Sequence, residues 1–165
     1  MSQKDKAQKS KDRGPESPRK AEEWTVKDLV DKYIYEIDLD ADYQREKVWQ
    51  EKDQERLINS VLLDIDIPKL YLAKTDSGYE CIDGKQRMLA LFRFFKPEKT
   101  EKKPLTVDYL GRKYTFSQLN DEHSDIIKKM QNYRLNFVIY QRSDLSEDFI
   151  RQIFIRLQLG VRLNS

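Results

Sequence analysis

The segment from Glu80 to Phe95 constrains the fold more than any other stretch, because it has the pattern of a strand, a tight turn and a helix. Gly84 lies at the turn, where the missing Cβ atom allows a sharp bend or a close approach to a ligand. The apolar residues after the turn recur with the spacing i, i+3, i+4 and i+7, which is one face of a helix: Met88, Leu91, Phe92 and Phe95. The segment therefore predicts a strand that leads directly into a helix with one buried face.

The first turn of this helix carries two cations, Lys85 and Arg87, on either side of Gln86. Basic residues are unusual there, because the positive end of the helix dipole favours anions by roughly 0.3–1 kcal/mol each. Free backbone N–H groups, the dipole and two cations together predict an anion site, most simply a phosphate site. The alternative is a strand-to-helix turn with a solvated polar first turn, and this pattern alone leaves both open.

Hydrophobic periodicity predicts further helices and strands around this segment. Helices are expected over about residues 26–33, 51–63 and 118–130, the last capped by Ser117, and from Ser146 to an end at Gly160. Strands are expected over residues 35–39, 70–73, 79–82 and 133–139, with a short hairpin over 105–116. Because strands and helices do not alternate regularly, the sequence predicts a compact α+β domain.

Residues 1–23 are charged and nearly devoid of apolar side chains, with seven Lys or Arg and five Asp or Glu. Such a segment cannot bury enough apolar surface to offset its ordering entropy, so we expect a disordered tail and a domain over 24–165. No apolar run suits a signal peptide or a membrane span. The single cysteine, Cys81, excludes an internal disulfide, which fits a reducing cytoplasm. The net charge of +2 argues neither for nor against a nucleic-acid partner.

Several motifs resemble, in order, those of the DUF262 family: Tyr43-Gln44-Arg45 with Trp49, the helix exit from Ile58 to Pro68, Ile82–Arg87, and Phe154–Asn164. That family includes the N-terminal domain of GmrSD-type modification-dependent restriction enzymes and is similar in fold to ParB and sulfiredoxin. The resemblance covers about residues 24–164 and departs from the family at Lys85, where Gln is usual, and at Gln158, where Asn is usual. It implies a compact ParB/sulfiredoxin-like α+β domain with a small mixed sheet packed by helices.

The resemblance also implies a function, namely binding and hydrolysis of a nucleoside triphosphate coupled to DNA cleavage in phage defence. In the family a helical region and often an HNH nuclease domain follow, so this chain would be a truncated or split member with a separate nuclease or helical partner. The nucleotide and Mg²⁺ are the ligands implied, and DNA would be engaged through the full assembly.

The resemblance extends to the residues that would hold the phosphates. Gly84 and Arg87 resemble the phosphate-binding turn of the ParB and sulfiredoxin relatives, in agreement with the anion site inferred above. Arg87 would hold phosphate oxygens through its planar guanidinium fork. Lys85 would either add charge to this turn or face solvent. Arg45 would be either a second phosphate contact or one partner of a structural ion pair.

Two residues of the same motif would carry the chemistry. Asp83 would hold Mg²⁺ directly or through water, since that ion favours a carboxylate together with substrate phosphates. Gln86 would orient a water molecule or a phosphate oxygen. The reactive cysteine of sulfiredoxin lies within the phosphate turn, at the position of Lys85, so Cys81 is expected to be a small buried apolar side chain instead.

Two other functions compete with nucleotide binding. In a nuclease of the PD-(D/E)xK type, Asp83 and Lys85 would form the acid-x-Lys element, but that element needs one regular strand, and Gly84 followed by a helix opposes it. An HNH nuclease needs more histidines than the one present, His123. A DNA- or protein-binding module without catalysis would use a basic, aromatic surface in place of a solvated charged face: Arg134, Arg142, Arg151, Arg156 and Arg162 with Tyr133 and Tyr140.

Overall fold

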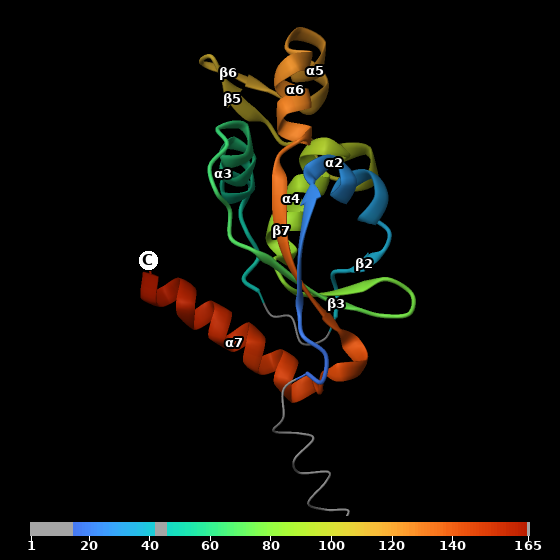
Figure 1. Ribbon diagram of the computed structural model, residues 1–165. Coiled ribbons are helices and arrows are strands. Elements are labelled where there is room, and N and C mark those ends of the chain that lie inside the picture. The colour runs from blue at the N-terminus through green and yellow to red at the C-terminus, as the bar shows by residue number, and fades with distance from the viewer. Residues whose placement is uncertain (1–14, 42–45, 165) are drawn as a thin grey trace, which may run out of the picture.

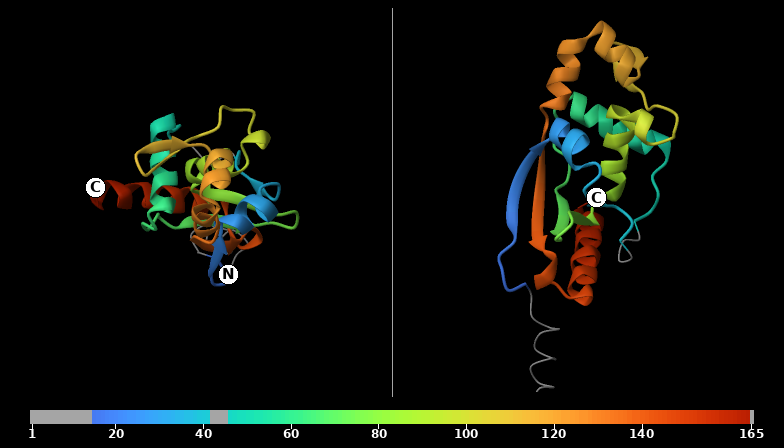
Figure 2. Two further views of the ribbon diagram at one scale, coloured as in Figure 1. Left: turned by 90° about the horizontal axis from the view of Figure 1, so that it is seen from above. Right: turned by 90° about the vertical axis from the view of Figure 1, so that its right-hand side faces the viewer.

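The structure, a computed structural model, describes residues 15–41 and 46–164, with side chains as far as residue 160. Its main strands are β1 (Lys20–Thr25), β2 (Ile37–Asp38), β3 (Leu70–Lys74), β4 (Tyr79–Asp83) and β7 (Arg134–Gln141). They form one sheet in the order β1-β7-β3-β4-β2 (Figures 1 and 2). The β1–β7 and β3–β4 pairs are antiparallel, whereas β3–β7 and β2–β4 are parallel, so the sheet is mixed.

Six α-helices and a small hairpin complete the described part of the chain. The helices are α2 (Val26–Asp28), α3 (Glu51–Leu62), α4 (Lys85–Phe95), α5 (Phe116–Glu122), α6 (Ser124–Gln131) and α7 (Glu147–Asn164). The hairpin joins β5 (Val107–Tyr109) to β6 (Arg112–Tyr114). In Figure 1 the hairpin, α5 and α6 gather at one end of the molecule, and α7 lies at the other. The α+β class predicted from the sequence is confirmed.

Alternating side chains of the central strands divide the core into two parts. Leu72 of β3 and Cys81 of β4 are fully buried in the larger cluster, with α3 and α4. Their neighbours Ala73 and Ile82 are fully buried in a second cluster, with Ile150 of α7. Because successive residues of a strand point to opposite faces, α4 and α7 pack against opposite faces of the same strands. Cys81 is the small buried side chain that the sequence predicts.

The predicted strand, turn and helix around Gly84 are confirmed. Gly84 has φ +111°, a conformation that side-chain-bearing residues rarely adopt. A Cβ atom there would lie 2.3 Å from Cδ2 of Leu70, which is itself fully buried. Helix α4 differs from the prediction in one respect, since Arg93 and Phe94 outside its apolar stripe are buried as well. Phe116 of α5 packs against Phe94, so α5 covers a side of α4 that lies outside its apolar stripe.

The N-terminal boundary of the domain is a correction to the sequence prediction. Residues 20–23 were expected in a disordered tail, but they belong to β1, whose six residues pair with β7 from Lys20–Ile139 to Thr25–Arg134. Only Trp24 of this strand is buried. A polar edge strand is held by backbone hydrogen bonds rather than by apolar burial, so hydrophobicity does not reveal it. The first fourteen residues of the predicted tail lie outside the described residues.

Other helices and strands also differ from the sequence prediction in where they begin and end. The helix predicted over 118–130 is two helices, interrupted at His123 (φ −141°, ψ 61°), and Thr115 rather than Ser117 caps the first of them. The final helix does not end at Gly160 but continues to Asn164. A glycine inside a helix costs about 1 kcal/mol relative to alanine and does not by itself end the helix. The strand predicted over 35–39 pairs only at Ile37 and Asp38.

Candidate functional site

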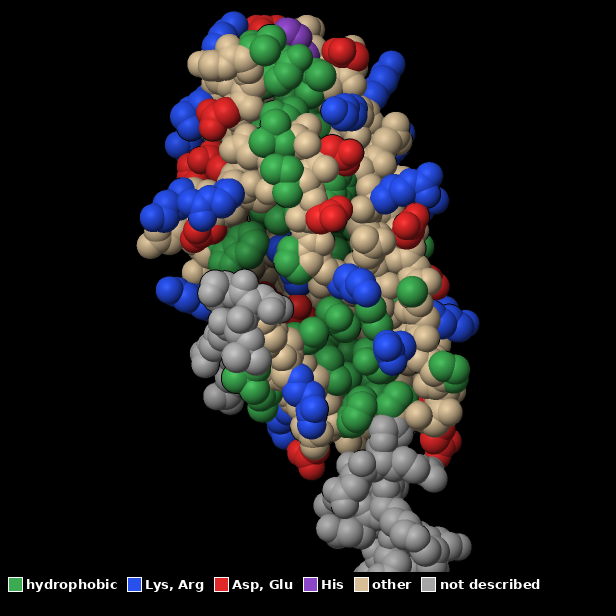
Figure 3. Space-filling view, turned by 60° about the vertical axis from the view of Figure 1, so that its left-hand side comes forward, with side chains coloured by type: hydrophobic (Ala, Val, Ile, Leu, Met, Phe, Trp, Pro, Cys, Tyr) green, Lys and Arg blue, Asp and Glu red, His purple; other side chains and the backbone are tan. Residues whose placement is uncertain are grey.

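A cavity of about 400 Å³ opens where β4 ends and α4 begins. Its lining combines acidic, basic, amide and apolar side chains: Glu46 and Asp83; Lys47, Lys69 and Arg87; Gln86 and Gln158; Trp49, Leu57, Pro68, Tyr71 and Leu157. These residues come from the segment before α3, from α3 and the loop that follows it, from the strands β3 and β4, and from α4 and α7. On the face drawn in Figure 3, apolar side chains gather in the lower half with Lys and Arg side chains around them.

The N-terminus of α4 already holds an anion, the carboxylate of Glu46. Oε1 of Glu46 accepts a hydrogen bond from the backbone N–H of Gly84 at 2.8 Å, and Oε2 accepts one from the N–H of Gln86 at 3.1 Å. These donors are among the four N–H groups that a helix leaves without an intrahelical partner. The predicted preference of this turn for an anion is therefore met inside the protein, by a carboxylate that sequence reasoning did not identify.

Asp83 and Arg87 form a buried ion pair beside this carboxylate. The guanidinium nitrogen Nη2 of Arg87 donates to Oδ2 of Asp83 at 2.9 Å, and each residue is only 8% exposed. The other carboxylate oxygen of Asp83 accepts from the side-chain amide of Gln158 on α7, at 3.3 Å. Asp83 is the last residue of β4 and Arg87 lies in the first turn of α4, so the tight turn at Gly84 brings the pair together. The Nη2 group of Arg87 is therefore already hydrogen bonded to Asp83 in this structure.

Burial raises the pKa of Asp83 from its ordinary 3.8 to about 6. The guanidinium of Arg87 opposes this by lowering the pKa, while the negative charge of Glu46 and a hydrogen bond between the two carboxyl groups raise it further. Loss of hydration penalises the charged form of a carboxyl group, and here it outweighs the ion pair. Asp83 therefore changes protonation state slightly below neutral pH, which is the range of a group suited to acid–base chemistry.

Gln86 connects α4 to the segment that precedes α3. Its side-chain oxygen accepts a hydrogen bond from the backbone N–H of Trp49 at 3.1 Å, and its own N–H donates to Glu46. Gln86 is buried, whereas Trp49 is partly buried and packs against the main core. The segment from Glu46 to Trp49 is therefore tied to the start of α4 by three hydrogen bonds, two through Glu46 and one through Gln86.

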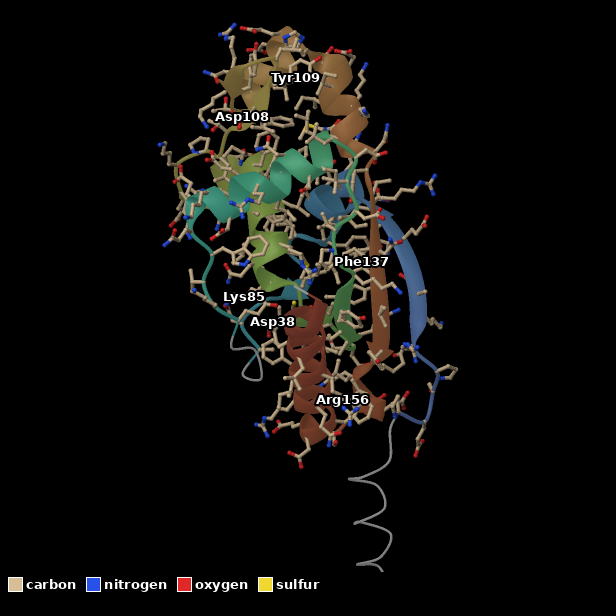
Figure 4. All side chains as sticks on the ribbon, turned by 90° about the vertical axis from the view of Figure 1, so that its left-hand side faces the viewer. Asp38, Lys85, Asp108, Tyr109, Phe137 and Arg156 are labelled. Carbon is tan, nitrogen blue, oxygen red and sulfur yellow. The ribbon has the colours of Figure 1, made fainter. Side chains whose placement is uncertain are left out.

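The structure brings four of the six predicted site residues to this cavity or its edge: Asp83, Gly84, Gln86 and Arg87. Lys85 is not among the cavity residues, because its Nζ atom pairs with the exposed carboxylate of Asp40 at 3.1 Å. Figure 4 shows Lys85 at the outer side of this end of α4. Arg45 lies outside the described residues.

The alternative functions find little support in this geometry. Asp83 ends a strand and Lys85 begins a helix, so the two do not share the regular strand that an acid-x-Lys nuclease element needs. Three arginines of the suggested basic surface are paired instead: Arg134 with Glu23, Arg142 with Glu80, and Arg151 with Glu147. Tyr133 is buried and donates to the carbonyl of Ile65. His123 packs edge-on against Tyr109 and Tyr114 rather than facing solvent freely.

Several cavity residues were missed by sequence reasoning. Glu46 is 38 residues from Gly84, Lys47 and Lys69 are isolated cations, and Tyr71 reads as an ordinary strand residue. Gln158 was noted only as part of a motif. No local spacing links these residues, and the adjacency of Glu46 to the motif Tyr43-Gln44-Arg45 is the one signal that pointed to it.

Among residues 15–41 and 46–164, no group of three or more His, Cys, Asp and Glu side chains is placed to hold a metal ion. Within the same ranges, every helix is too short or too polar to serve as a membrane span.

Comparison with known proteins identifies the family. A search of curated proteins found no match. The family model described as the GmrSD restriction endonuclease, N-terminal domain, matches residues 26–164, which is most of the chain and includes the whole cavity. The chain therefore belongs to the family of GmrSD restriction endonuclease N-terminal domains.

Proposed function

We propose that the chain binds a nucleoside triphosphate in the cavity beside α4 and hydrolyses it as part of a restriction system. The observation that carries this proposal is the junction of a helix N-terminus, three cations and two aromatic rings around one cavity of about 400 Å³. That volume falls within the range of about 300–1,000 Å³ that small-molecule sites occupy. We propose further that the fold is ParB/sulfiredoxin-like and that the system acts in phage defence.

The phosphates would lie at the start of α4. The carboxylate of Glu46 on the N–H groups of Gly84 and Gln86 supports this placement, because a bound anion marks the position that the helix dipole favours. Lys47 and Lys69 line the same cavity, are exposed, and have no ion-pair partner among the described residues. Their charge, together with that of Arg87, matches a polyphosphate better than a neutral ligand.

The base would lie between the aromatic residues of the cavity. Trp49 precedes α3 and Tyr71 lies on β3, and both line the cavity with partly buried rings. Stacking of a nucleobase on an aromatic ring contributes about 1–3 kcal/mol and does not depend strongly on which base is present. This arrangement supports a nucleotide over inorganic phosphate without selecting one of the four bases.

The site also fits a magnesium ion. Mg²⁺ is usually held by one or two carboxylates together with substrate phosphates, and Asp83 and Glu46 are two neighbouring carboxyl groups at this cavity. Asp83 would hold the ion, which would neutralise charge on the phosphates. The amide nitrogen of Gln86, whose oxygen is held by Trp49, would donate to a phosphate oxygen or to water. DNA recognition and cleavage would belong to the full assembly and its nuclease partner.

A nucleotide screen tests the proposal. Each of the four ribonucleoside triphosphates is added at millimolar concentration, with and without Mg²⁺, and thermal unfolding is followed. Ligand at 100 times Kd stabilises the folded state by about 2.7 kcal/mol, and each kcal/mol raises Tm by about 2–4 °C for a chain of this size. Absence of a shift with all four nucleotides would overturn the proposal.

Matched variants locate the bound nucleotide and separate hydrolysis from binding. Lys69→Gln removes a cation from the cavity and should reduce the shift, whereas Lys113→Gln removes one from the distant β6 strand and should not. Release of inorganic phosphate, measured in the same samples, reports hydrolysis. Equal reduction by both variants would indicate a general charge effect and contradict binding in this cavity.

A further inference from the structure

Glu46 holds a position that a phosphate would need. Its two carboxylate oxygens each accept a hydrogen bond, from the N–H of Gly84 at 2.8 Å and from the N–H of Gln86 at 3.1 Å. A backbone N–H group directed at one acceptor is not available to a second acceptor in the same place. A carboxylate and a phosphate oxygen are therefore alternative ligands of the same donors.

The carboxylate is also placed beside another acidic group. Glu46 neighbours Asp83 closely enough that the charge of Glu46 makes ionisation of Asp83 less favourable. A phosphate added without movement of Glu46 would bring a third acidic group into the same space, where like charges at short range repel. Removing Glu46 from the N–H groups relieves this repulsion at the moment that the phosphate arrives.

The segment that carries Glu46 is joined to the start of α4 by three hydrogen bonds. Two are accepted by the Glu46 carboxylate, and the third runs from the N–H of Trp49 to the side chain of Gln86. Lys47 on this segment is exposed and points to the cavity lining. Release of Glu46 would free Lys47 and Trp49 to move relative to α4.

We propose that Glu46 is an internal competitor of the phosphate group, which occupies the N–H groups of Gly84 and Gln86 until a nucleotide displaces it. This inference rests on the proposed nucleotide site. In the closed form, Glu46 occupies the N–H groups of Gly84 and Gln86, and phosphate cannot bind there; in the open form, Glu46 has left them. The apparent affinity for phosphate therefore equals the intrinsic affinity of the open form multiplied by the fraction of molecules that are open. Displacement of Glu46 also changes the surroundings of the Trp49 ring, because Trp49 lies three residues further along the same segment and borders the same cavity.

The test compares the binding of inorganic triphosphate and of each nucleoside triphosphate to the full chain and its variants. Glu46→Gln removes the charge and leaves one side-chain oxygen, which can accept a hydrogen bond from the N–H of Gly84 or of Gln86 where the carboxylate accepts one from each. We expect it to bind about tenfold more tightly than the wild type, as a wild-type chain open about a tenth of the time would require. Glu46→Asp keeps the charge but shortens the side chain, so it should also bind more tightly.

Glu55→Gln is the matched control. Glu55 also accepts two hydrogen bonds, from the backbone and the hydroxyl of Thr106, but it does not line the cavity. Its substitution should leave affinity at the wild-type value. Tryptophan fluorescence provides the signal, since Trp24 is buried in a stack with Tyr33 and Trp49 borders the cavity. Thermal unfolding without ligand verifies that each variant is folded, and Glu46→Asp serves if Glu46→Gln is not.

The outcomes distinguish the two proposals. Tighter binding by both Glu46 variants, with the control unchanged, supports the competition. If the wild type binds and Glu46→Gln binds equally or more weakly, the competition is overturned but the proposed nucleotide site is not. Tighter binding by Glu46→Gln alone assigns the effect to charge and overturns occupancy of the N–H groups. Absence of binding by the wild type and all variants overturns both.

Discussion

Substitution of Asp83 by asparagine should change how the stability of the protein depends on pH. Burial raises the pKa of Asp83 in the folded state to about 6, against an ordinary value of 3.8 that applies when the chain is unfolded. Between these values the folded state binds more protons than the unfolded state, so the free energy of unfolding falls as the pH rises. The stabilisation is fully present below pH 4 and is lost once the pH passes about 6.

The size of the effect follows from the two pKa values. They differ by about two pH units, and each unit corresponds to about 1.4 kcal/mol, so the ionisation of Asp83 costs about 3 kcal/mol of folded-state stability at neutral pH. This is an upper bound, because movement of the charged side chain toward water or toward Arg87 lowers the cost. Asparagine has a similar shape and no charge, so the variant lacks this pH dependence.

Urea unfolding of the wild type and Asp83→Asn from pH 4 to pH 7.5 measures the difference. Other carboxyl groups titrate in both proteins and cancel when one curve is subtracted from the other. The free energy of unfolding of the wild type, relative to the variant, should fall by up to about 3 kcal/mol over this range. Asp108→Asn, made at an exposed ion pair on β5, controls for the substitution itself.

Two results would refute this reasoning. If the stability of the wild type relative to the variant does not change with pH, the rise in the pKa of Asp83 from burial would be cancelled by the fall caused by the ion pair with Arg87. A relative stability that rises with pH would mean that the ion pair dominates and that the pKa of Asp83 lies below 3.8 in the folded state. Either result would remove Asp83 as a group that titrates near neutral pH.

Four further outcomes are expected. Gly84→Ala should reduce the free energy of unfolding by more than about 1 kcal/mol, measured by urea unfolding, because alanine disfavours φ +111° and its Cβ would meet the buried Leu70. Arg87→Ala should weaken nucleotide binding by about 2–3 kcal/mol, the scale of a lost charge-assisted contact, as titration would show. Asp83→Asn should lower phosphate release far more than nucleotide affinity if Asp83 positions the metal or water, and equal turnover would leave a binding module. The purified chain should leave plain and modified duplex DNA uncut, and metal-dependent cutting that is lost in Lys85→Ala would instead favour the nuclease.

The sequence alone predicted the local structure around the site. The apolar spacing after Gly84 predicted α4, because the helix period is a property of neighbouring residues, and the strand β4 was predicted over residues 79–82. Gly84 between the strand and the helix predicted a sharp turn, and the structure forms it with φ +111°. The preference of this turn for an anion also followed from local chemistry, namely N–H groups without intrahelical partners and a helix dipole.

The tertiary structure decided which groups satisfy that chemistry. Glu46 reaches the N–H groups of Gly84 and Gln86 across 38 and 40 residues of sequence, and no periodic pattern spans that distance. Arg87, the predicted phosphate ligand, also pairs with Asp83, because both side chains are buried and a buried charge needs a partner. Lys85, in the same turn, points to Asp40 instead of the cavity.

The same division holds for the rest of the fold. β1 was not recognisable as a strand, because its residues other than Trp24 are exposed or only partly buried and β7 supplies its hydrogen bonds. The buried side chains of α4 outside its apolar stripe depend on other segments: Phe94 packs against Phe116 of α5, and Arg93 donates hydrogen bonds to Gln54 of α3 and to the carbonyl of Lys103. Local periodicity and backbone conformation are short-range effects that the sequence determines. Burial and the choice of hydrogen-bond partner depend on where distant segments meet, and only the packed structure determines them.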